Sequence, residues 1–94
     1  MSSTREELLK IYNHFGQEKQ LENLREEVEE LIEAVKSGNR EHMIEETADV
    51  LVLINQITNK EEIHSYDTMP VFRQKIDRTL ERIETKYYEQ EEAN

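Results

Sequence analysis

Only two glycines and one proline interrupt the 94 residues of this chain. They fall between stretches whose apolar residues recur every three or four positions, which is the period of an amphipathic α-helix. No stretch alternates apolar and polar residues in the manner of a β-strand. The sequence therefore predicts an all-α fold, with residues 1–94 forming a single domain.

Capping and turn signals mark the first two helices. Ser3-Thr4-Arg5-Glu6 has the pattern of a capping box that opens a helix, and Gly16 is expected to end that helix. The second helix carries apolar residues from Leu21 to Val35 at spacings of 3, 4, 3 and 4. Ser37-Gly38-Asn39 is a clear stop signal after it.

A third helix is expected from about Arg40 to Thr58, and its segment from Val50 to Ile54 is apolar on every side. A chain of 94 residues with 35% hydrophobic residues builds only a small core, so it cannot easily cover such a segment alone. We expect a subunit interface, rather than the other helices of the same chain, to bury this segment. We therefore expect a four-helix-type bundle that is completed by homodimerisation.

Charge and composition exclude several classes of function. The net charge of −10 argues against nucleic acid or an anionic membrane as a main partner, because both need a basic surface. There is no cysteine, so neither disulfides nor a thiolate metal site stabilises the fold. No apolar run has the length of a signal peptide core or a membrane span, and we expect a cytoplasmic protein.

Asp49 stands at the start of the apolar run in EETADVLVLINQI (residues 45–57), where a buried carboxylate is costly unless a partner pairs with it. Six acidic pairs have the i, i+3 spacing that brings two carboxylates together on a helix, and most such pairs simply face solvent. Two pairs border the apolar stripes instead: Glu27/Glu30 and Glu46/Asp49. Two antiparallel helices would bring these four acids together, where they repel one another unless cations bind. Oxygen ligands without cysteine favour Mg²⁺ or Mn²⁺.

The segment from Phe15 to Ile57 resembles the MazG-type all-α nucleoside triphosphate pyrophosphatases, whose signature is Glu-x-x-Glu, a variable spacer and Glu-x-x-Asp. The matching acids are Glu27, Glu30, Glu46 and Asp49, and residues 31–45 form the spacer. The lead-in Gly16…Gln20-Leu21 also agrees with the family. Either acidic pair alone is common, whereas the four-acid pattern in this context is fairly specific.

The resemblance implies Mg²⁺-dependent hydrolysis of a (d)NTP to a (d)NMP and pyrophosphate. It also implies a homodimer whose helices form a bundle, sometimes doubled into a tetramer. The four acids would hold the metal, which activates a water and bridges phosphate oxygens. Glu30 or Glu46 would accept the proton of the attacking water, and the sequence does not choose between them.

The last helix is expected to begin at Asp67, with Pro70 in its first turn. It carries a basic stripe at offsets of 3, 4 and 4, formed by Lys75, Arg78, Arg82 and Lys86. We expect this stripe to contact the substrate's phosphates. These residues would instead pair with acids of their own helix if they form only a solvated face. Gln20, two turns before Glu27, is a further candidate for nucleotide contact.

A different class of function also fits part of the sequence. A non-catalytic, acidic helical dimerisation module would explain the heptad spacing and the high charge. It would not explain why Asp49 enters an apolar run, nor why basic residues form a single stripe. We therefore favour the enzyme as the primary hypothesis.

Overall fold

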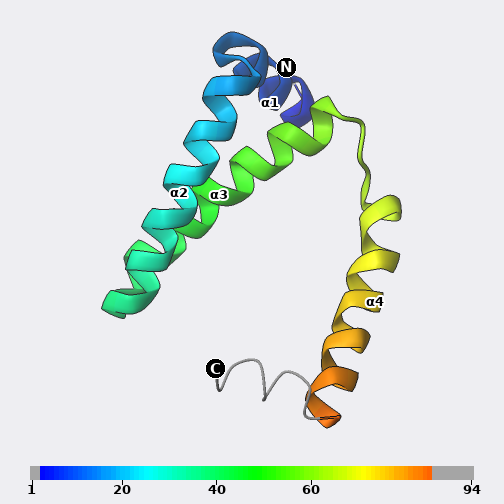
Figure 1. Cartoon of the computed structure of the whole chain (residues 1–94). Coiled ribbons are helices and arrows are strands. Elements are labelled where there is room, and N and C mark those ends of the chain that lie inside the picture. Colours follow the sequence, from blue (N-terminus) through cyan, green and yellow to red (C-terminus); the bar gives the residue numbers. More distant parts are fainter. Residues whose placement is uncertain (1–2, 86–94) are drawn as a thin grey trace. The chain divides into compact units, whose positions relative to one another are not determined.

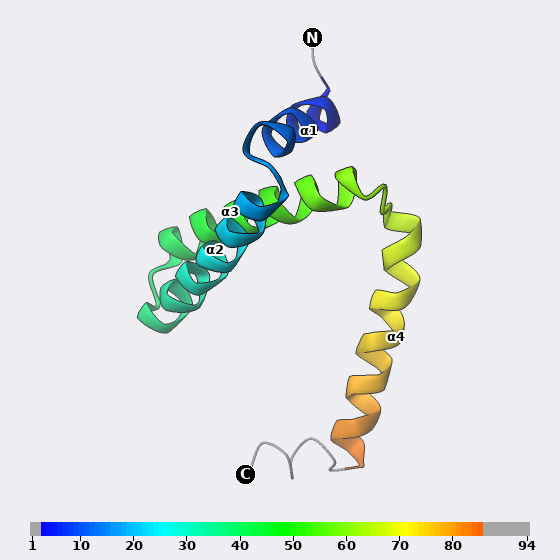
Figure 2. The ribbon, with the colours of Figure 1, turned by 45° about the horizontal axis from the view of Figure 1, so that its top comes forward.

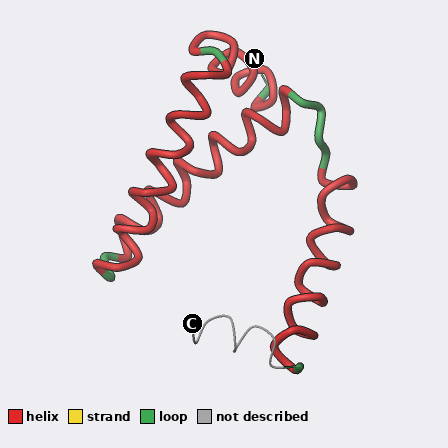
Figure 3. The backbone as a smooth tube through the Cα atoms, viewed as in Figure 1, coloured by secondary structure: helices red, strands yellow, loops and turns green. Residues whose placement is uncertain are grey.

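A computed structural model describes residues 3–85 of the chain, and no strand occurs among them. The four helices are α1 (Thr4–Phe15), α2 (Gln17–Ser37), α3 (Arg40–Lys60) and α4 (Ser65–Glu84) (Figures 1 and 3). The all-α prediction is therefore confirmed for these residues. Helices α1 to α3 belong to one compact unit, which ends at Glu62, and α4 belongs to a second. The two units are described separately.

Helix α1 begins and ends where the sequence predicts. The side chain of Ser3 accepts a hydrogen bond of 3.1 Å from the backbone N–H of Glu6. Gly16 follows the last residue of α1 with a φ of 88°, a conformation that glycine adopts without steric cost. The N–H of Gly16 donates to the carbonyl of Tyr12, and α2 begins at the next residue.

Helices α2 and α3 form an antiparallel hairpin and lie side by side in both views of the ribbon (Figures 1 and 2). Gly38 makes the turn in the left-handed conformation, with a φ of 73°. Asn39 then caps α3, because its side chain accepts a hydrogen bond of 3.1 Å from the N–H of His42. Helix α3 extends to Lys60, slightly beyond its predicted end at Thr58.

The core of the first unit is small. Its buried apolar residues are Tyr12 from α1, Ala34 from α2, and Val50 and Leu53 from α3. Helix α1 contacts both helices of the hairpin. A far larger set of apolar side chains stays exposed on these three helices: Ile11, Phe15, Leu21, Val28, Ile32, Val35, Ile44, Leu51, Val52 and Ile54.

The segment from Val50 to Ile54, which is apolar on every side, is buried on one side only. Val50 and Leu53 are only 9% and 7% exposed, whereas Leu51, Val52 and Ile54 are 50%, 44% and 41% exposed. Within the first unit, the helices therefore cover only one side of the segment. The subunit interface that would cover the other side stays a prediction.

Helix α4 begins earlier than the sequence predicts. Its N-cap is His64, whose backbone N–H donates a 2.9 Å hydrogen bond to the side chain of Asp67. Asp67 therefore acts from inside the first turn and is not the cap itself, so the predicted start is wrong. Pro70 consequently lies inside the helix, where it removes one backbone hydrogen bond.

No residue of α4 is buried, although one of its faces is apolar. That face carries Phe72, Ile76, Leu80 and Ile83, at spacings of 4, 4 and 3. None of the helices in residues 3–85 combines the length and the apolar character that crossing a membrane requires.

Candidate metal centre

Three carboxylates from the two helices of the hairpin converge on one point. Glu27 extends from α2, and Glu46 and Asp49 extend from α3. Each offers one oxygen, and these three oxygens lie within 4.8 Å of one another. The tight turn at Gly38 makes α2 and α3 antiparallel neighbours, so acids that are distant in sequence meet across the seam between the helices.

Two oxygens of this cluster are buried without a hydrogen-bond partner: Oε2 of Glu27 and Oε2 of Glu46. Both residues are partly buried, whereas Asp49 is exposed. An acceptor that is buried and unpaired loses its hydration without compensation, which typically costs about 1–3 kcal/mol and more when it is charged. A divalent cation would remove this cost. The two unpaired oxygens therefore fit a metal site.

The pKa of Glu27 is raised by its burial and by the neighbouring carboxyl groups. Burial is the main cause that raises the pKa of Glu27 from 4.5 to about 7. The neighbouring carboxyl groups of Glu46 and Glu30 raise the pKa further, as do the negative charges of Glu30 and Asp49. A proton and a cation therefore compete for this carboxylate near neutral pH.

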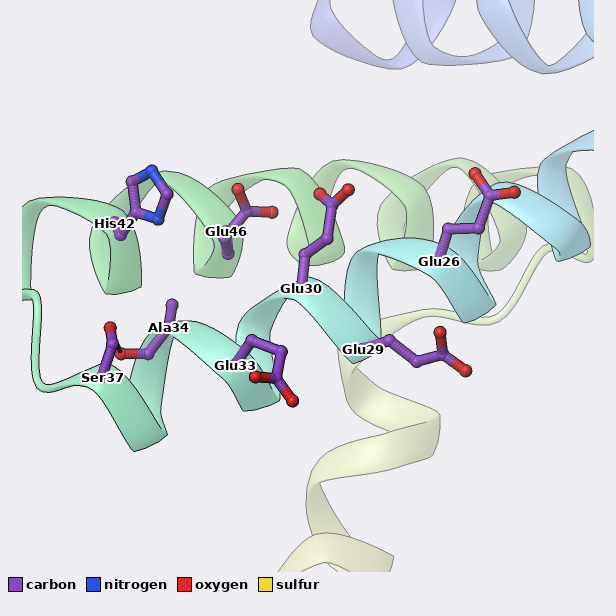
Figure 4. A pocket seen from close by; sticks show the side chains of 8 residues that line it. All are labelled: Glu26, Glu29, Glu30, Glu33, Ala34, Ser37, His42 and Glu46. Carbon is purple, nitrogen blue, oxygen red and sulfur yellow. Dashed lines mark hydrogen bonds between the residues drawn. The ribbon is translucent and has the colours of Figure 1, made fainter.

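Glu30, the fourth predicted ligand, is not among the three acids whose oxygens converge. It lines an open cavity of about 730 Å³ beside the cluster, together with Glu46 and His42. In Figure 4 the side chains of Glu30, Glu46 and His42 project toward the same side of the hairpin. The rest of the cavity wall consists of Glu26, Glu29, Glu33, Ala34 and Ser37. Glu30 thus stands next to the cluster, and its place among the ligands stays a prediction.

The donor set determines which ion suits the site. The converging atoms are all carboxylate oxygens, which are hard ligands that suit Mg²⁺ and Mn²⁺. His42 is the one imidazole on the cavity wall. It is exposed in the first turn of α3, one turn before Glu46.

The predicted phosphate-binding residues Lys75, Arg78 and Arg82 lie on α4, and Lys86 lies outside the described residues. Within residues 3–85, neither Lys75 nor Arg78 forms an ion pair, whereas Arg73 pairs with Asp77 at 2.9 Å. Arg78 and Arg82 line a shallow hollow with Glu81 and Thr85. These observations place the three described residues of the stripe on one helix. Its contact with a substrate stays a prediction.

Gln20 lies inside the first unit and is only 2% exposed. Its Nε2 donates a 2.7 Å hydrogen bond to Oε1 of Gln56 on α3, and its Oε1 accepts one of 2.7 Å from Nδ2 of Asn23. A direct contact with a nucleotide would have to compete with these bonds, and it stays a prediction. Sequence reasoning missed Gln56. Its signal was a polar residue on the buried face of α3, three positions after Leu53.

The four acids and the helix that follows them fall within one family match. The family model of the MazG nucleotide pyrophosphohydrolase domain matches residues 15–86. No curated protein and no solved structure matches the chain significantly. The family match covers well over half of the sequence and includes both acidic pairs and all of α4. This chain belongs to the MazG nucleotide pyrophosphohydrolase domain family.

Proposed function

We propose that this chain is a Mg²⁺-dependent nucleoside triphosphate pyrophosphohydrolase that converts a (d)NTP to a (d)NMP and pyrophosphate. The observation that carries the proposal is the convergence of Glu27, Glu46 and Asp49 across the α2–α3 seam, with two buried oxygens left unpaired. Membership of the family supports the reaction type. A dimerisation module alone would gain nothing from the repulsion within this cluster.

The acids of the cluster and its surroundings have different roles in the proposed reaction. Glu27, Glu46 and Asp49 hold the cation, with Glu30 beside them. A cation bound there would neutralise phosphate charge and make water a better nucleophile. Glu30 is the better candidate for accepting the water's proton, because it stands on the cavity wall outside the group of converging oxygens. As the water oxygen bonds to the α-phosphorus, the bond to the β-phosphate oxygen breaks and pyrophosphate leaves.

Helix α4 supplies positive charge to the substrate in this proposal. The triphosphate brings several negative charges to a site that is itself acidic, so counter-charge is needed. Lys75, Arg78 and Arg82 provide it from one helix, and Lys75 and Arg78 have no ion-pair partner among residues 3–85. We expect these three side chains to contact the phosphates.

We further propose that the active form is a homodimer, with a tetramer as the larger alternative, and that residues 1–94 act as one domain. The exposed apolar side chains support an oligomer, because they outnumber the four buried apolar residues of the core. Burial of such side chains stabilises an interface by roughly 25 cal/mol per Å². The family match extends from α2 through α4, which supports a single functional domain.

The proposal is tested by incubating the purified full chain with a panel of ribo- and deoxyribonucleoside triphosphates. Pyrophosphate and orthophosphate are measured separately, with Mg²⁺ and with chelator. We expect monophosphate and pyrophosphate in equal amounts, and only with the metal. Release of orthophosphate alone would point to a different bond being cleaved. No turnover of any nucleotide by a folded, oligomeric protein would favour the dimerisation module.

A further inference from the structure

We propose that the hydrogen bond between Gln20 and Gln56 is a positioning device, which fixes the register of α2 against α3 and so aligns the metal-binding carboxylates. The inference rests on the proposed function, because it concerns the same site. It assigns to Gln20 a role in holding the helices, in place of contact with the nucleotide.

The two amides form an unusual pair in this chain. Among residues 3–85 they are the only buried polar residues, each only 2% exposed. The 2.7 Å bond from Nε2 of Gln20 to Oε1 of Gln56 joins α2 to α3 directly. Asn23, one turn further along α2, donates to the remaining acceptor of Gln20 and so fixes the orientation of its amide.

The position of the pair follows the geometry of the hairpin. Gln20 on α2 and Gln56 on α3 stand at equal distances along the sequence from Gly38, one before it and one after it. In an antiparallel hairpin of two helices, residues at equal distances from the turn lie at the same height along the axes. The two amides therefore meet because the hairpin has this one register.

The carboxylates obey the same rule. Glu27 and Asp49 are equally far along the sequence from the turn glycine, on opposite sides of it. Glu30 and Glu46 are also equally far from it, and both are closer to the turn. The register that pairs the amides is thus the register that sets the acids of α2 opposite the acids of α3.

The apolar contacts of the seam do not define this register by themselves. The buried apolar residues of the two helices are only Ala34, Val50 and Leu53, and small axial shifts between apolar surfaces cost little because burial is not directional. A cation such as Mg²⁺ is far less tolerant, since it requires oxygens at about 2.0–2.1 Å in near-ideal geometry. A shift of about 1 Å between the helices would spoil that geometry.

The amide pair penalises such a shift. Moving one helix along the other would separate the two side chains and leave polar groups buried without partners, which is unfavourable. The turn at Gly38 restrains one end of the hairpin, and the amide pair restrains it beyond the acids. Gln20 lies two helical turns from Glu27, or about 10 Å along the helix, so the amides act through the helices and do not touch the ion.

The test replaces both partners by apolar side chains of similar length, in the full chain, as the double variant Gln20→Met/Gln56→Met. Replacing a buried hydrogen-bonded pair by apolar groups of the same shape leaves stability nearly unchanged. We expect a thermal midpoint close to that of the wild type, because Asn23, which loses its acceptor on Gln20, is only partly buried and can bond to water instead. We also expect Mg²⁺ affinity, measured by titration calorimetry without nucleotide, to fall at least tenfold. A merely structural pair would leave Mg²⁺ affinity unchanged whenever stability is unchanged.

Two further variants complete the experiment. Leu53→Val removes a buried methylene from the next turn of α3 without touching the amides, so it should lower the thermal midpoint and leave Mg²⁺ affinity within threefold. Gln56→Asn keeps the amide but shortens the side chain by one methylene, so its oxygen no longer reaches Nε2 of Gln20. It should therefore also lower Mg²⁺ affinity, and it carries the test if the double variant does not fold. Unchanged Mg²⁺ affinity in folded Gln56→Asn would overturn the inference.

The outcomes separate this inference from the proposed function. If the wild type binds no Mg²⁺, the proposed function fails and the inference fails with it. If the wild type binds Mg²⁺ and the folded double variant binds it equally well, only the positioning role is overturned. Loss of affinity in the double variant with retention in Leu53→Val supports it.

Discussion

The α2–α3 hairpin and helix α4 differ in how far each organises its own chemistry. The hairpin buries two amides that bond to each other and brings three carboxylates within 4.8 Å. Helix α4 buries no residue and belongs to a separate unit, so its basic stripe is defined only along one helix. A functional cluster is thus assembled locally where a tight turn joins its two halves. A single helix without such a neighbour presents its side chains but does not by itself fix what they contact.

The largest effect is expected at the hairpin. Asp49→Asn keeps the size of the side chain and removes one charge from the cluster, so it should lower kcat by about 10³-fold, or about 4 kcal/mol. In chelator, its stability should equal or exceed that of the wild type by about 1 kcal/mol, because like charges repel. Mg²⁺ should raise the melting temperature of the wild type much more than that of the variant.

Glu22→Gln is the matched control for this change, since Glu22 is an exposed acid of α2 outside the cluster. It should alter neither turnover nor the response to Mg²⁺. If Asp49→Asn is less stable in chelator, and the wild type does not respond to Mg²⁺, Asp49 is only a hydrogen-bonded acid and the metal site is wrong.

A second prediction concerns the apolar surface that one chain leaves uncovered. Leu51 is 50% exposed in the single chain, so Leu51→Asp should cost little if α3 faces water. If a partner subunit covers it, burying an unpaired charge should cost several kcal/mol and dissociate or unfold the protein. Analytical ultracentrifugation at micromolar concentration checks this, with Gln17→Asp as a control of equal charge change. A wild type that sediments as a folded monomer would exclude the proposed dimer.

The same contrast explains how much the sequence could predict. Helix positions and the meeting of Glu27 with Glu46 and Asp49 follow from local signals: capping, apolar period and a glycine turn. The predicted start of α4 was wrong. An aspartate such as Asp67 can be the N-cap residue or the third residue of a capping box, and the sequence does not distinguish these two positions. The hydrogen bond between Gln20 and Gln56 was not predicted, because equal distances from Gly38 show which residues face each other but not that two polar side chains are buried between the helices.

A third prediction tests whether α4 takes part in catalysis at all. Arg78→Ala should lower kcat/KM by about 10- to 100-fold, because a phosphate contact is lost. Stability should change by less than about 0.5 kcal/mol, since Arg78 is exposed and makes no ion pair in residues 3–85. Arg73→Ala is the control on the same helix, because Arg73 is engaged with Asp77 outside the stripe. Equal activity of the two variants would reduce the stripe to a solvated surface.

The smallest expected effect is the pH dependence of the metal-free hairpin. The pKa of Glu27 is raised from 4.5 to about 7, so the folded protein holds this proton more tightly than the unfolded chain does. The resulting stabilisation is fully present below about pH 4.5, and it is lost as the pH rises through 7. Because Glu27 is only partly buried and solvent screens its charge, we expect a loss of roughly 1 to 2 kcal/mol across this window.

Urea denaturation in chelator, at several pH values between 4.5 and 8, measures this loss when the wild type is compared with Glu27→Gln. The variant cannot titrate at this position, so the difference in unfolding free energy should shift in its favour as the pH rises. Saturating Mg²⁺ should abolish the shift, because the cation replaces the proton as the partner of the carboxylate. A difference that stays constant with pH would mean that the pKa of Glu27 is not raised in the folded hairpin, and that neither burial nor the neighbouring carboxylates act on this group as the proposed cluster requires.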